Sequence, residues 1–311
     1  MMETTLADLF AILASIVFLW KGSDWTVDKA SALAARYNIS EVTIGVTIIA
    51  LGTSLPELAA SVTSAYKQHG DLALSNVVGS NIFNLGFILG LAILASPLPV
   101  SRESLKRDTP LLLGISLLIL GFALDLYLGR VIGLILLLVL GVYIISLLRK
   151  YGRQPRFTPV SKETSFSAGD GIKLVLGLGM VVAGGHLIVE GALGIGSELG
   201  IEEWALGLSV TAFGTSLPEF VVCLSSVLKR KQGILFGNLL GSDIFNFAGV
   251  LGLACLSNPI RVTPDALIGL IMLSASYGLL LVFMRTGWRL SRTEGIVILI
   301  LSLFREIYFF L

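Results

Sequence analysis

Long apolar stretches alternate with short polar ones along almost the whole chain. Crossing the hydrocarbon core of a bilayer takes about 20 mostly apolar residues in a helix. The stretches that meet this requirement are expected to be transmembrane helices, numbered one to ten in order, over residues 5–22, 42–66, 72–95, 109–127, 130–148, 168–190, 204–228, 234–256, 264–284 and 293–311. The pattern therefore predicts an all-α integral membrane protein.

Composition agrees with a chain that has lipid as its solvent. Of its 311 residues, 55% are hydrophobic and 14% are charged, whereas soluble domains carry about 25% charged residues. A net charge of +1 argues against nucleic acid as a partner. Cys223 and Cys255 lie in apolar runs, and two such cysteines do not make a disulfide framework or a thiolate metal site. No residue pattern predicts a bound cofactor.

The longest polar stretch, 149–167, contains two prolines and five cations and is expected to be a cytoplasmic linker. It separates a first five-helix repeat, 1–148, from a second one, 168–311. Loops that stay in the cytoplasm carry an excess of Lys and Arg. With the N-terminus outside, the inside loops hold seventeen of these residues, including Lys29, Arg36, Arg102 and Arg107, and the outside loops hold three, including Arg261. We therefore expect a multi-pass protein of the cell membrane with both termini extracellular.

An internal repeat relates the two halves without a gap. Adding 162 to a residue number maps Gly-Thr-Ser-Leu-Pro-Glu at 52–57 onto the same six residues at 214–219, and Ile-Phe-Asn at 82–84 onto 244–246. Chance apolar similarity does not match polar residues, glycines and prolines at one fixed offset. Because each half has an odd number of helices, the second half enters the membrane from the opposite side. This predicts the inverted-topology repeat of many secondary transporters, whose site lies at the repeat interface near the midplane.

Two glutamates occupy equivalent places inside the apolar helices. Glu57 lies about two-thirds of the way along helix 2, and Glu219 has the same place in helix 7. A carboxylate at that depth is costly unless it faces a partner or a water-filled cavity, and neither helix has a Lys or Arg nearby. Two protonated structural glutamates are the alternative, and the symmetry of the pair favours a functional site.

The neighbours of these glutamates favour a cation site. Thr53 and Ser54 precede Glu57 by four and three residues, so their hydroxyls share a helix face with the carboxylate. Pro56 lacks a backbone N–H and its ring clashes with the carbonyl of Gly52, so a kink is expected there that frees carbonyl oxygens. The second half repeats these positions as Gly214, Thr215, Ser216, Pro218 and Glu219.

Helices 3 and 8 add further oxygens. Ser80 and Asn84 are four residues apart and hence on one face, and Ser242 and Asn246 repeat the arrangement. Small and polar residues in membrane helices can also serve only to hold helices together. The combined set holds carboxylates, amides, hydroxyls and freed carbonyls. Such oxygen ligands suit hard cations: calcium takes six to eight of them and two carboxylates balance its charge. Sodium can compete for the same oxygens.

The paired motifs resemble the alpha repeats of the sodium/calcium exchanger family, in the cation/calcium antiporter superfamily. Each Gly-Thr-Ser-Leu-Pro-Glu is followed by Gly-Ser-Asn/Asp-Ile-Phe-Asn, and the short linker is similar to that of compact prokaryotic members. The resemblance implies ions bound between helices 2, 3, 7 and 8, while helices 1 and 6 slide to alternate access. The ligands that it implies are Glu57, Glu219, Thr53, Ser54, Thr215, Ser216, Ser80, Ser242, Asn84 and Asn246, with the carbonyls of Ala50 and Ala212.

Two positions depart from patterns in the family. Potassium-dependent exchangers have an aspartate where this chain has Asn246, which argues against potassium co-transport. Asp243 stands where its repeat partner is Asn81, off the face of Ser242 and Asn246, so packing or support of the site is favoured over direct ligation. Proton-coupled calcium exchangers carry Gly-Asn-x-x-Glu in these helices, and both copies here lack that glutamate.

We therefore expect a secondary antiporter that exchanges Na⁺ for Ca²⁺, not an enzyme. A Ca²⁺/H⁺ or broader divalent-cation antiporter is the alternative, since glutamates also exchange protons. A passive channel could use the same oxygens but fits an inverted repeat with broken helices less well. An intramembrane hydrolase is disfavoured because neither Ser54 nor Ser216 has a base nearby in sequence. The expected partners are the two ions and the lipid bilayer, with no obligate protein partner.

Overall fold

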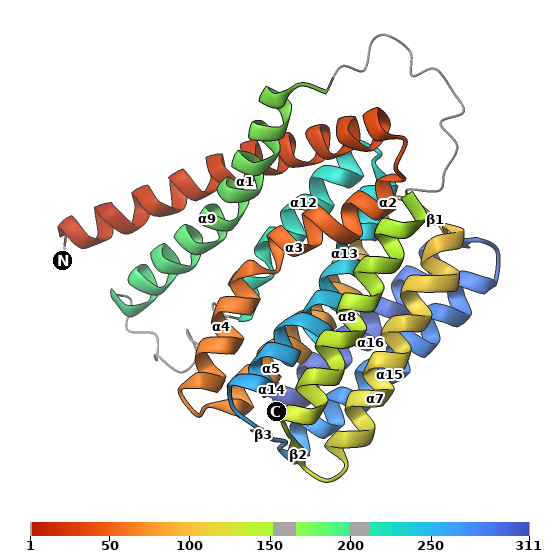
Figure 1. The fold of residues 1–311 in the computed structure, drawn as a ribbon. Coiled ribbons are helices and arrows are strands. Elements are labelled where there is room, and N and C mark those ends of the chain that lie inside the picture. The colour runs from red at the N-terminus through yellow and green to blue at the C-terminus, as the bar shows by residue number, and fades with distance from the viewer. Residues whose placement is uncertain (1, 152–165, 199–211, 311) are drawn as a thin grey trace.

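The computed structural model describes residues 2–151, 166–198 and 212–310, nearly all of them helical (Figure 1). Most of the predicted linker 149–167 and the beginning of the predicted helix 204–228 lie outside the described residues. The first half contains α1 (Met2–Tyr37), α2 (Glu41–Ile44), η1 (Gly45–Ile49), α3 (Ala50–Thr53), α4 (Leu55–Tyr66), α5 (Gly70–Ile82), η2 (Phe83–Ile88), α6 (Leu89–Ala95), β1 (Leu98–Pro99), η3 (Ser104–Asp108), α7 (Thr109–Ala123), β2 (Tyr127–Leu128) and α8 (Arg130–Tyr151).

The second half follows the same order. It contains α9 (Ala168–Glu198), α11 (Ala212–Thr215), α12 (Leu217–Leu228), α13 (Gln232–Ile244), η5 (Phe245–Leu251), α14 (Gly252–Ser257), β3 (Ile260–Arg261), α15 (Pro264–Arg285), β4 (Arg289–Leu290) and α16 (Arg292–Phe310). The elements named η are π-helical turns, which widen an α-helix and occur often at functional sites. Within the described residues, six helices are long and apolar enough to cross a membrane, and a seventh span is formed if one bent pair is counted.

The first helix extends well beyond the predicted end at residue 22. Charged residues close the apolar window there, but α1 continues to Tyr37 because these charges find partners on neighbouring helices. Lys229, at the end of α12, lies 2.6 Å from Asp24 and 2.7 Å from Asp28. Lys29 lies 2.7 Å from Asp170 at the start of α9. Polar residues thus end the hydrophobic pattern without ending the helix.

The predicted kink beside Pro56 is confirmed. The helical segments Glu41–Thr53 and Leu55–Tyr66 meet at an angle of 49°, with Ser54 at the break (φ −82°, ψ 6°). Pro56 has no N–H to donate to the carbonyl of Gly52, so the helical ladder is interrupted there. Ser216 has nearly the same backbone angles (φ −91°, ψ 3°) between α11 and α12. Both copies of the motif therefore break their helix at the serine.

Two short antiparallel ribbons join the halves. Strand β1 pairs with β4, and β2 pairs with β3, so each ribbon takes one strand from each half. Since β1 and β3 are 162 residues apart, as are β2 and β4, the repeat offset converts one ribbon into the other. The ribbons lie at opposite ends of the helix bundle (Figure 1). Between them, α13 and η5 are buried at almost every residue and form the centre of the molecule.

Helices α1 and α9 run side by side across one face of this bundle (Figure 1). Their contact is close because glycines allow it: a Cβ atom added to Gly184 of α9 would come within 2.9 Å of the Leu19 side chain. Gly185 instead faces the ring of Pro218, where an added Cβ would meet it at 3.3 Å. Gly179 has no described atom within 4 Å of such a Cβ. Two of these three α9 glycines therefore lie at helix contacts.

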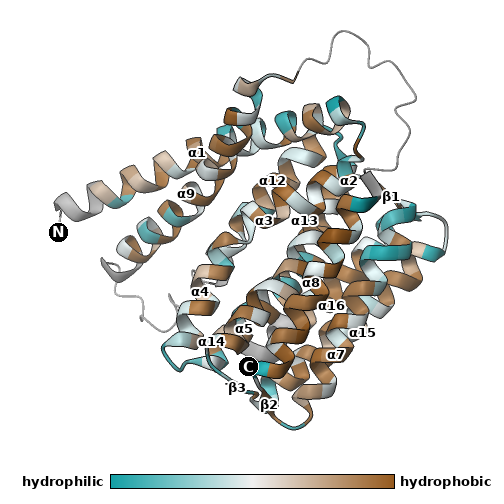
Figure 2. Cartoon of the chain, in the orientation of Figure 1, coloured by the Kyte–Doolittle hydropathy of each residue, from teal (hydrophilic) through white to brown (hydrophobic). Residues whose placement is uncertain are grey.

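The exterior of the bundle is far more apolar than that of a soluble protein. Large apolar side chains such as Leu134, Leu138 and Val142 are exposed on the outer helices, whose surfaces are hydrophobic along most of their length (Figure 2). Ionisable groups such as Glu57 and Glu219 are fully buried. Lipid is the solvent that such an exterior requires. The chain is a multi-pass membrane protein.

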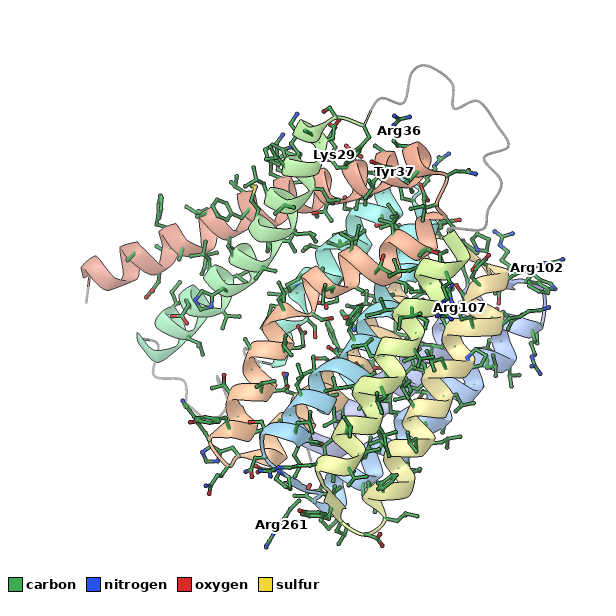
Figure 3. The ribbon with its side chains drawn as sticks, in the orientation of Figure 1. Lys29, Arg36, Tyr37, Arg102, Arg107 and Arg261 are labelled. Carbon is green, nitrogen blue, oxygen red and sulfur yellow. The ribbon has the colours of Figure 1, made fainter. Side chains whose placement is uncertain are left out.

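Cations gather at the ends of the bundle. Lys29, Arg36, Arg102 and Arg107, all predicted to be cytoplasmic, lie at one end, and Arg261, predicted to be extracellular, lies at the other (Figure 3). The loops that the sequence assigns to opposite sides of the membrane are thus at opposite ends of the molecule.

Candidate cation site

The two broken helices bring their glutamates into the interior. Glu57 is in the first turn of α4 and Glu219 is in the first turn of α12, and both side chains are fully buried. The helix breaks at Ser54 and Ser216 explain this placement, because each new helix begins just before its glutamate. Neither carboxylate has a Lys or Arg partner among the salt bridges of the described residues.

Each glutamate takes a hydrogen bond from the serine of the other half. The hydroxyl of Ser54 donates to Oε1 of Glu219, and the hydroxyl of Ser216 donates to Oε1 of Glu57, both over 3.3 Å. These two bonds are equivalent under the repeat offset. The motifs therefore face each other across the interface of the halves, and the predicted serine and glutamate oxygens form one cluster.

Helix α13 closes one side of this cluster. The hydroxyl of Ser242 donates to Oε1 of Glu219 over 2.7 Å and lies 2.6 Å from Oγ of Ser54. Its repeat partner Ser80, on α5, is also buried. The predicted hydroxyls of helices 3 and 8 thus lie in the interior, and the hydroxyl of Ser242 is in direct contact with the carboxylate cluster.

The two asparagines lie in the π-helical turns η2 and η5. Asn84 and Asn246 are almost completely buried. The amide nitrogen of Asn84 donates to Oδ1 of Asp243 over 3.0 Å, and that of Asn246 donates to Oδ1 of Asn81 over 3.0 Å. Each amide is therefore held by a residue of the other half, which again follows the repeat.

Five predicted ligand oxygens have no hydrogen-bond partner in the structure. Seven buried side-chain polar atoms of the described residues are in this position, and five belong to the predicted site: Oε2 of Glu57, Oε2 of Glu219, Oδ1 of Asn84, Oδ1 of Asn246 and Oγ1 of Thr215. Folded proteins leave few buried polar atoms unsatisfied, because each costs about 1–3 kcal/mol. Such a gathering of unsatisfied oxygens is the arrangement that a bound cation would complete.

Two predicted ligands of the first half are engaged with each other. The hydroxyl of Thr53 donates to the carbonyl of Ala50 over 3.3 Å and also approaches Oδ1 of Asn238 at 3.2 Å. The same carbonyl accepts the backbone N–H of Ser54 over 3.0 Å. In the second half, Ala212 begins the described helix α11, and the hydroxyl of Thr215 has no partner. The hydroxyls of Thr53 and Thr215 are therefore engaged differently in the two halves.

Sequence reasoning did not assign Asn81, Asn238 or Tyr277 to the surroundings of the site. Tyr277 lies on α15 and donates to Oδ2 of Asp243 over 2.8 Å. It belongs to neither repeated motif, so no sequence signal marked it. Asn81 and Asn238 occur beside the motifs, but their contacts cross between halves, which spacing along one helix does not reveal.

The arrangement is suited to binding a cation. It offers two carboxylates and several neutral oxygens, a set that matches Ca²⁺ and Na⁺ in hardness. No group of three or more His, Cys, Asp or Glu residues that could hold a metal occurs in the described part of the chain. The neutral oxygens are therefore essential to any cation site here.

Comparison with known proteins decides the family. A model of the family described as "Sodium/calcium exchanger protein" matches residues 8–149 and 172–306. The chain belongs to the sodium/calcium exchanger family. Membership places this exchanger-family chain among cation/calcium antiporters, which are transporters and not enzymes.

Relatives of similar length support the assignment. The putative antiporter CaxA of Alkalimonas amylolytica is 36% identical over 94% of this chain and 95% of the relative. The sodium/calcium exchanger MaX1 of Methanosarcina acetivorans is 33% identical over 93% of this chain and 94% of the relative. A solved structure of the sodium-calcium exchanger NCX_Mj, soaked with Na⁺, superposes with a TM-score of 0.88 at 28% identity, covering 96% and 98% of the two chains. The resemblance seen in the motifs is confirmed.

Proposed function

We propose that this protein is a secondary active antiporter that exchanges Na⁺ for Ca²⁺ across the cell membrane. The single observation that carries the proposal is the cluster of unsatisfied buried oxygens around Glu57 and Glu219. Two glutamates balance one Ca²⁺, and the same oxygens accept Na⁺, so the two ions compete for one site. Membership of the sodium/calcium exchanger family and the likeness to NCX_Mj support this choice of ions.

The site proposed here lies near the midplane, between helices 2, 3, 7 and 8 of the sequence numbering. These correspond to α2–α4, α5–α6, α11–α12 and α13–α14. Its proposed ligands come from the residues of both motifs, with Glu57 and Glu219 at the centre. The cross-repeat bonds from Ser54 and Ser216 support a shared site, because each half contributes the donor for the other half's acid.

We extend the proposal to the architecture: ten transmembrane helices in two inverted repeats, 1–148 and 168–311, joined by a cytoplasmic linker. The two ribbons support it, since the repeat offset interconverts them and they lie at opposite ends of the bundle (Figure 1). Both termini are then extracellular. In such proteins alternating access comes largely from motion of one group of helices against another. Here the pair α1 and α9 is proposed to slide across the site.

The test is a flux measurement with purified protein in proteoliposomes. Na⁺-loaded vesicles diluted into Na⁺-free buffer should accumulate radioactive Ca²⁺, and external Na⁺ should abolish the uptake, because the ions share one site. Gradients of K⁺ and H⁺, imposed separately at equal Na⁺, should not drive uptake. Empty vesicles and vesicles with a Ca²⁺ ionophore control for binding and leakage.

Each competing function predicts a different outcome. Ca²⁺ uptake that ignores the Na⁺ gradient removes the coupling proposed here. Uptake driven by a pH gradient without Na⁺ establishes the proton-coupled alternative. Rapid Ca²⁺ flux with no countertransported ion establishes a channel.

A further inference from the structure

Asp243 is a buried carboxylate next to the cluster of glutamates and hydroxyls. It lies on α13, one residue beyond Ser242, and its side chain is 1% exposed. Oδ1 accepts the amide N–H of Asn84 over 3.0 Å, and Oδ2 accepts the hydroxyl of Tyr277 over 2.8 Å. Both carboxylate oxygens are therefore occupied by neutral donors, and Asp243 itself is absent from the set of unsatisfied oxygens.

The backbone of the same residue holds the second asparagine of the site. The carbonyl of Asp243 accepts the amide N–H of Asn81 over 3.3 Å. Oδ1 of Asn81 in turn accepts the amide N–H of Asn246 over 3.0 Å. A backbone carbonyl only accepts, so this contact fixes which end of the Asn81 amide faces it, and Asn81 then fixes Asn246. Both site amides are thus oriented from position 243.

The orientation of these amides matters for a cation. A carboxamide carries its acceptor oxygen and its donor nitrogen on opposite sides, and the two ends are nearly identical in shape. With the nitrogens bound at position 243 and at Asn81, the oxygens of Asn84 and Asn246 remain buried and without partners. An amide turned the other way would present N–H groups, which repel a cation.

We propose that Asp243 is a positioning residue that holds the amide of Asn84 with its oxygen turned to the transported cation. The inference rests on the proposed function, because it needs a cation in the site. The hydroxyl of Tyr277 donates a hydrogen bond to the second oxygen of Asp243 and thereby keeps the carboxylate directed at Asn84. The negative charge of Asp243 is incidental to this role, and its acceptor atom is essential.

Two substitutions at position 243 separate the role of the acceptor atom from that of the negative charge. Asp243→Asn keeps an oxygen for Asn84 and turns its NH₂ to the Tyr277 hydroxyl, which also accepts, so the half-saturating Ca²⁺ concentration should stay within about threefold of wild type. Asp243→Leu keeps most of the volume but removes the acceptor, so that concentration should rise at least about tenfold. The maximal rate should change less than the half-saturating concentration in both.

A double-substitution cycle tests whether Asp243 acts through Asn84. In an Asn84→Ala background, Asp243→Leu should change the half-saturating Ca²⁺ concentration by less than about twofold, because the shared interaction is already absent. Full addition of the two effects overturns the proposal. An equal rise of the half-saturating Ca²⁺ concentration in Asp243→Asn and Asp243→Leu also overturns the proposal, because it indicates that the negative charge is needed. A wild-type half-saturating concentration in Asp243→Leu overturns it too, because it indicates that Asp243 only fills space.

Folding and the proposed function are checked separately. Gel filtration in detergent shows whether each variant is folded. Should Asp243→Leu not fold, Asp243→Ser takes its place, since the shorter hydroxyl side chain does not reach the Asn84 amide and should give the same loss. If the wild type does not exchange Ca²⁺ for Na⁺, only the proposed function is contradicted. The half-saturating concentrations of the variants and the wild type are then compared with Sr²⁺ or Mn²⁺ in place of Ca²⁺. A wild type that binds none of these cations overturns both.

Discussion

At the scale of single residues, the sequence predicted which oxygens lie together in the interior better than it predicted their hydrogen-bond partners. Spacing put Ser54 and Glu57 on one helix face, and both do lie in the candidate site. The hydrogen bond of Ser54, however, goes to Glu219 in the other half. Residues three or four apart reveal neighbours on one helix, whereas a contact between helices depends on how they cross. How two helices cross is a property of the tertiary structure, which spacing along one helix does not reveal.

The surroundings of the asparagines show the same limit. The sequence favoured a supporting role for Asp243 because it lies off the face of Ser242 and Asn246, and in the structure both of its carboxylate oxygens accept hydrogen bonds from neutral donors. Its actual partners, Asn84 and Tyr277, come from two other helices. Tyr277 lies in an apolar segment that resembles any other membrane helix, so only the fold could identify it.

The two glutamates should be indispensable for transport. Glu57→Gln and Glu219→Gln each remove one of the two charges that face a divalent cation in a low-dielectric interior, so the half-saturating Ca²⁺ concentration should rise at least about a hundredfold. Radioactive Ca²⁺ uptake into proteoliposomes measures this. Asp125→Asn makes the same chemical change at an exposed loop position and should transport normally.

Wild-type uptake in either glutamine variant would contradict the candidate site. A large loss in only one of them would show that the two halves contribute unequally. The serine bonds are symmetric, but Glu219 has an additional donor in Ser242.

At the scale of helices, glycine sets how closely α13 crosses the first broken helix. A Cβ atom added to Gly241 would come within 2.6 Å of Cα of Val46 and 2.7 Å of Cβ of Ala50. Its repeat partner Gly79 has no described atom within 4 Å of an added Cβ. Gly241 therefore lets α13 pack directly against the backbone of the first broken helix.

This contact gives a matched pair of substitutions. Gly241→Ala forces helices apart at the candidate site and should lower the free energy of unfolding by about 1–3 kcal/mol. Gly114→Ala adds the same methyl group at an exposed position of α7, with no described atom within 4 Å, and should leave stability unchanged or raise it by about 0.5–1 kcal/mol, since alanine favours a helix. Apparent melting temperatures in detergent report the order of the three proteins. A lower melting temperature for Gly114→Ala than for Gly241→Ala would contradict this account of the crossing.

At the scale of the whole molecule, the apolar pattern located nearly every described helix. Two differences have physical causes. The bend at Ser54 divides one predicted helix into two segments, and charged residues end the apolar pattern in the middle of α1 although the helix continues. The offset of 162 residues correctly predicted paired elements such as α4 with α12 and α5 with α13. The ribbons were not predicted, because two-residue strands leave no periodic signal.

The proposed orientation can be tested at the ends of the bundle. Arg102 and Arg261 are exposed at opposite ends (Figure 3), and the excess of Lys and Arg assigns them to the inside and the outside. In intact cells, a membrane-impermeant maleimide should therefore label Arg261→Cys and not Arg102→Cys. The native Cys223 and Cys255 are buried and should give little background.

Permeabilised cells provide the control for this labelling, since both introduced cysteines should then react. Labelling of Arg102→Cys alone in intact cells would reverse the orientation and place both termini in the cytoplasm. Labelling of both in intact cells would contradict a bundle that separates the two ends by a membrane.

The cross-repeat serine bonds have a consequence for the origin of such a chain. Glu57 relies on Ser216 for a donor, and Glu219 relies on Ser54. A polypeptide with only one half would hold an acid without its donor and a donor without its acid, and it would be complete only beside a second, oppositely inserted copy of itself. Gene duplication and fusion would make that pairing permanent. Afterwards, a substitution of the serine in one copy of the motif would remove the hydrogen-bond donor of the glutamate in the other copy.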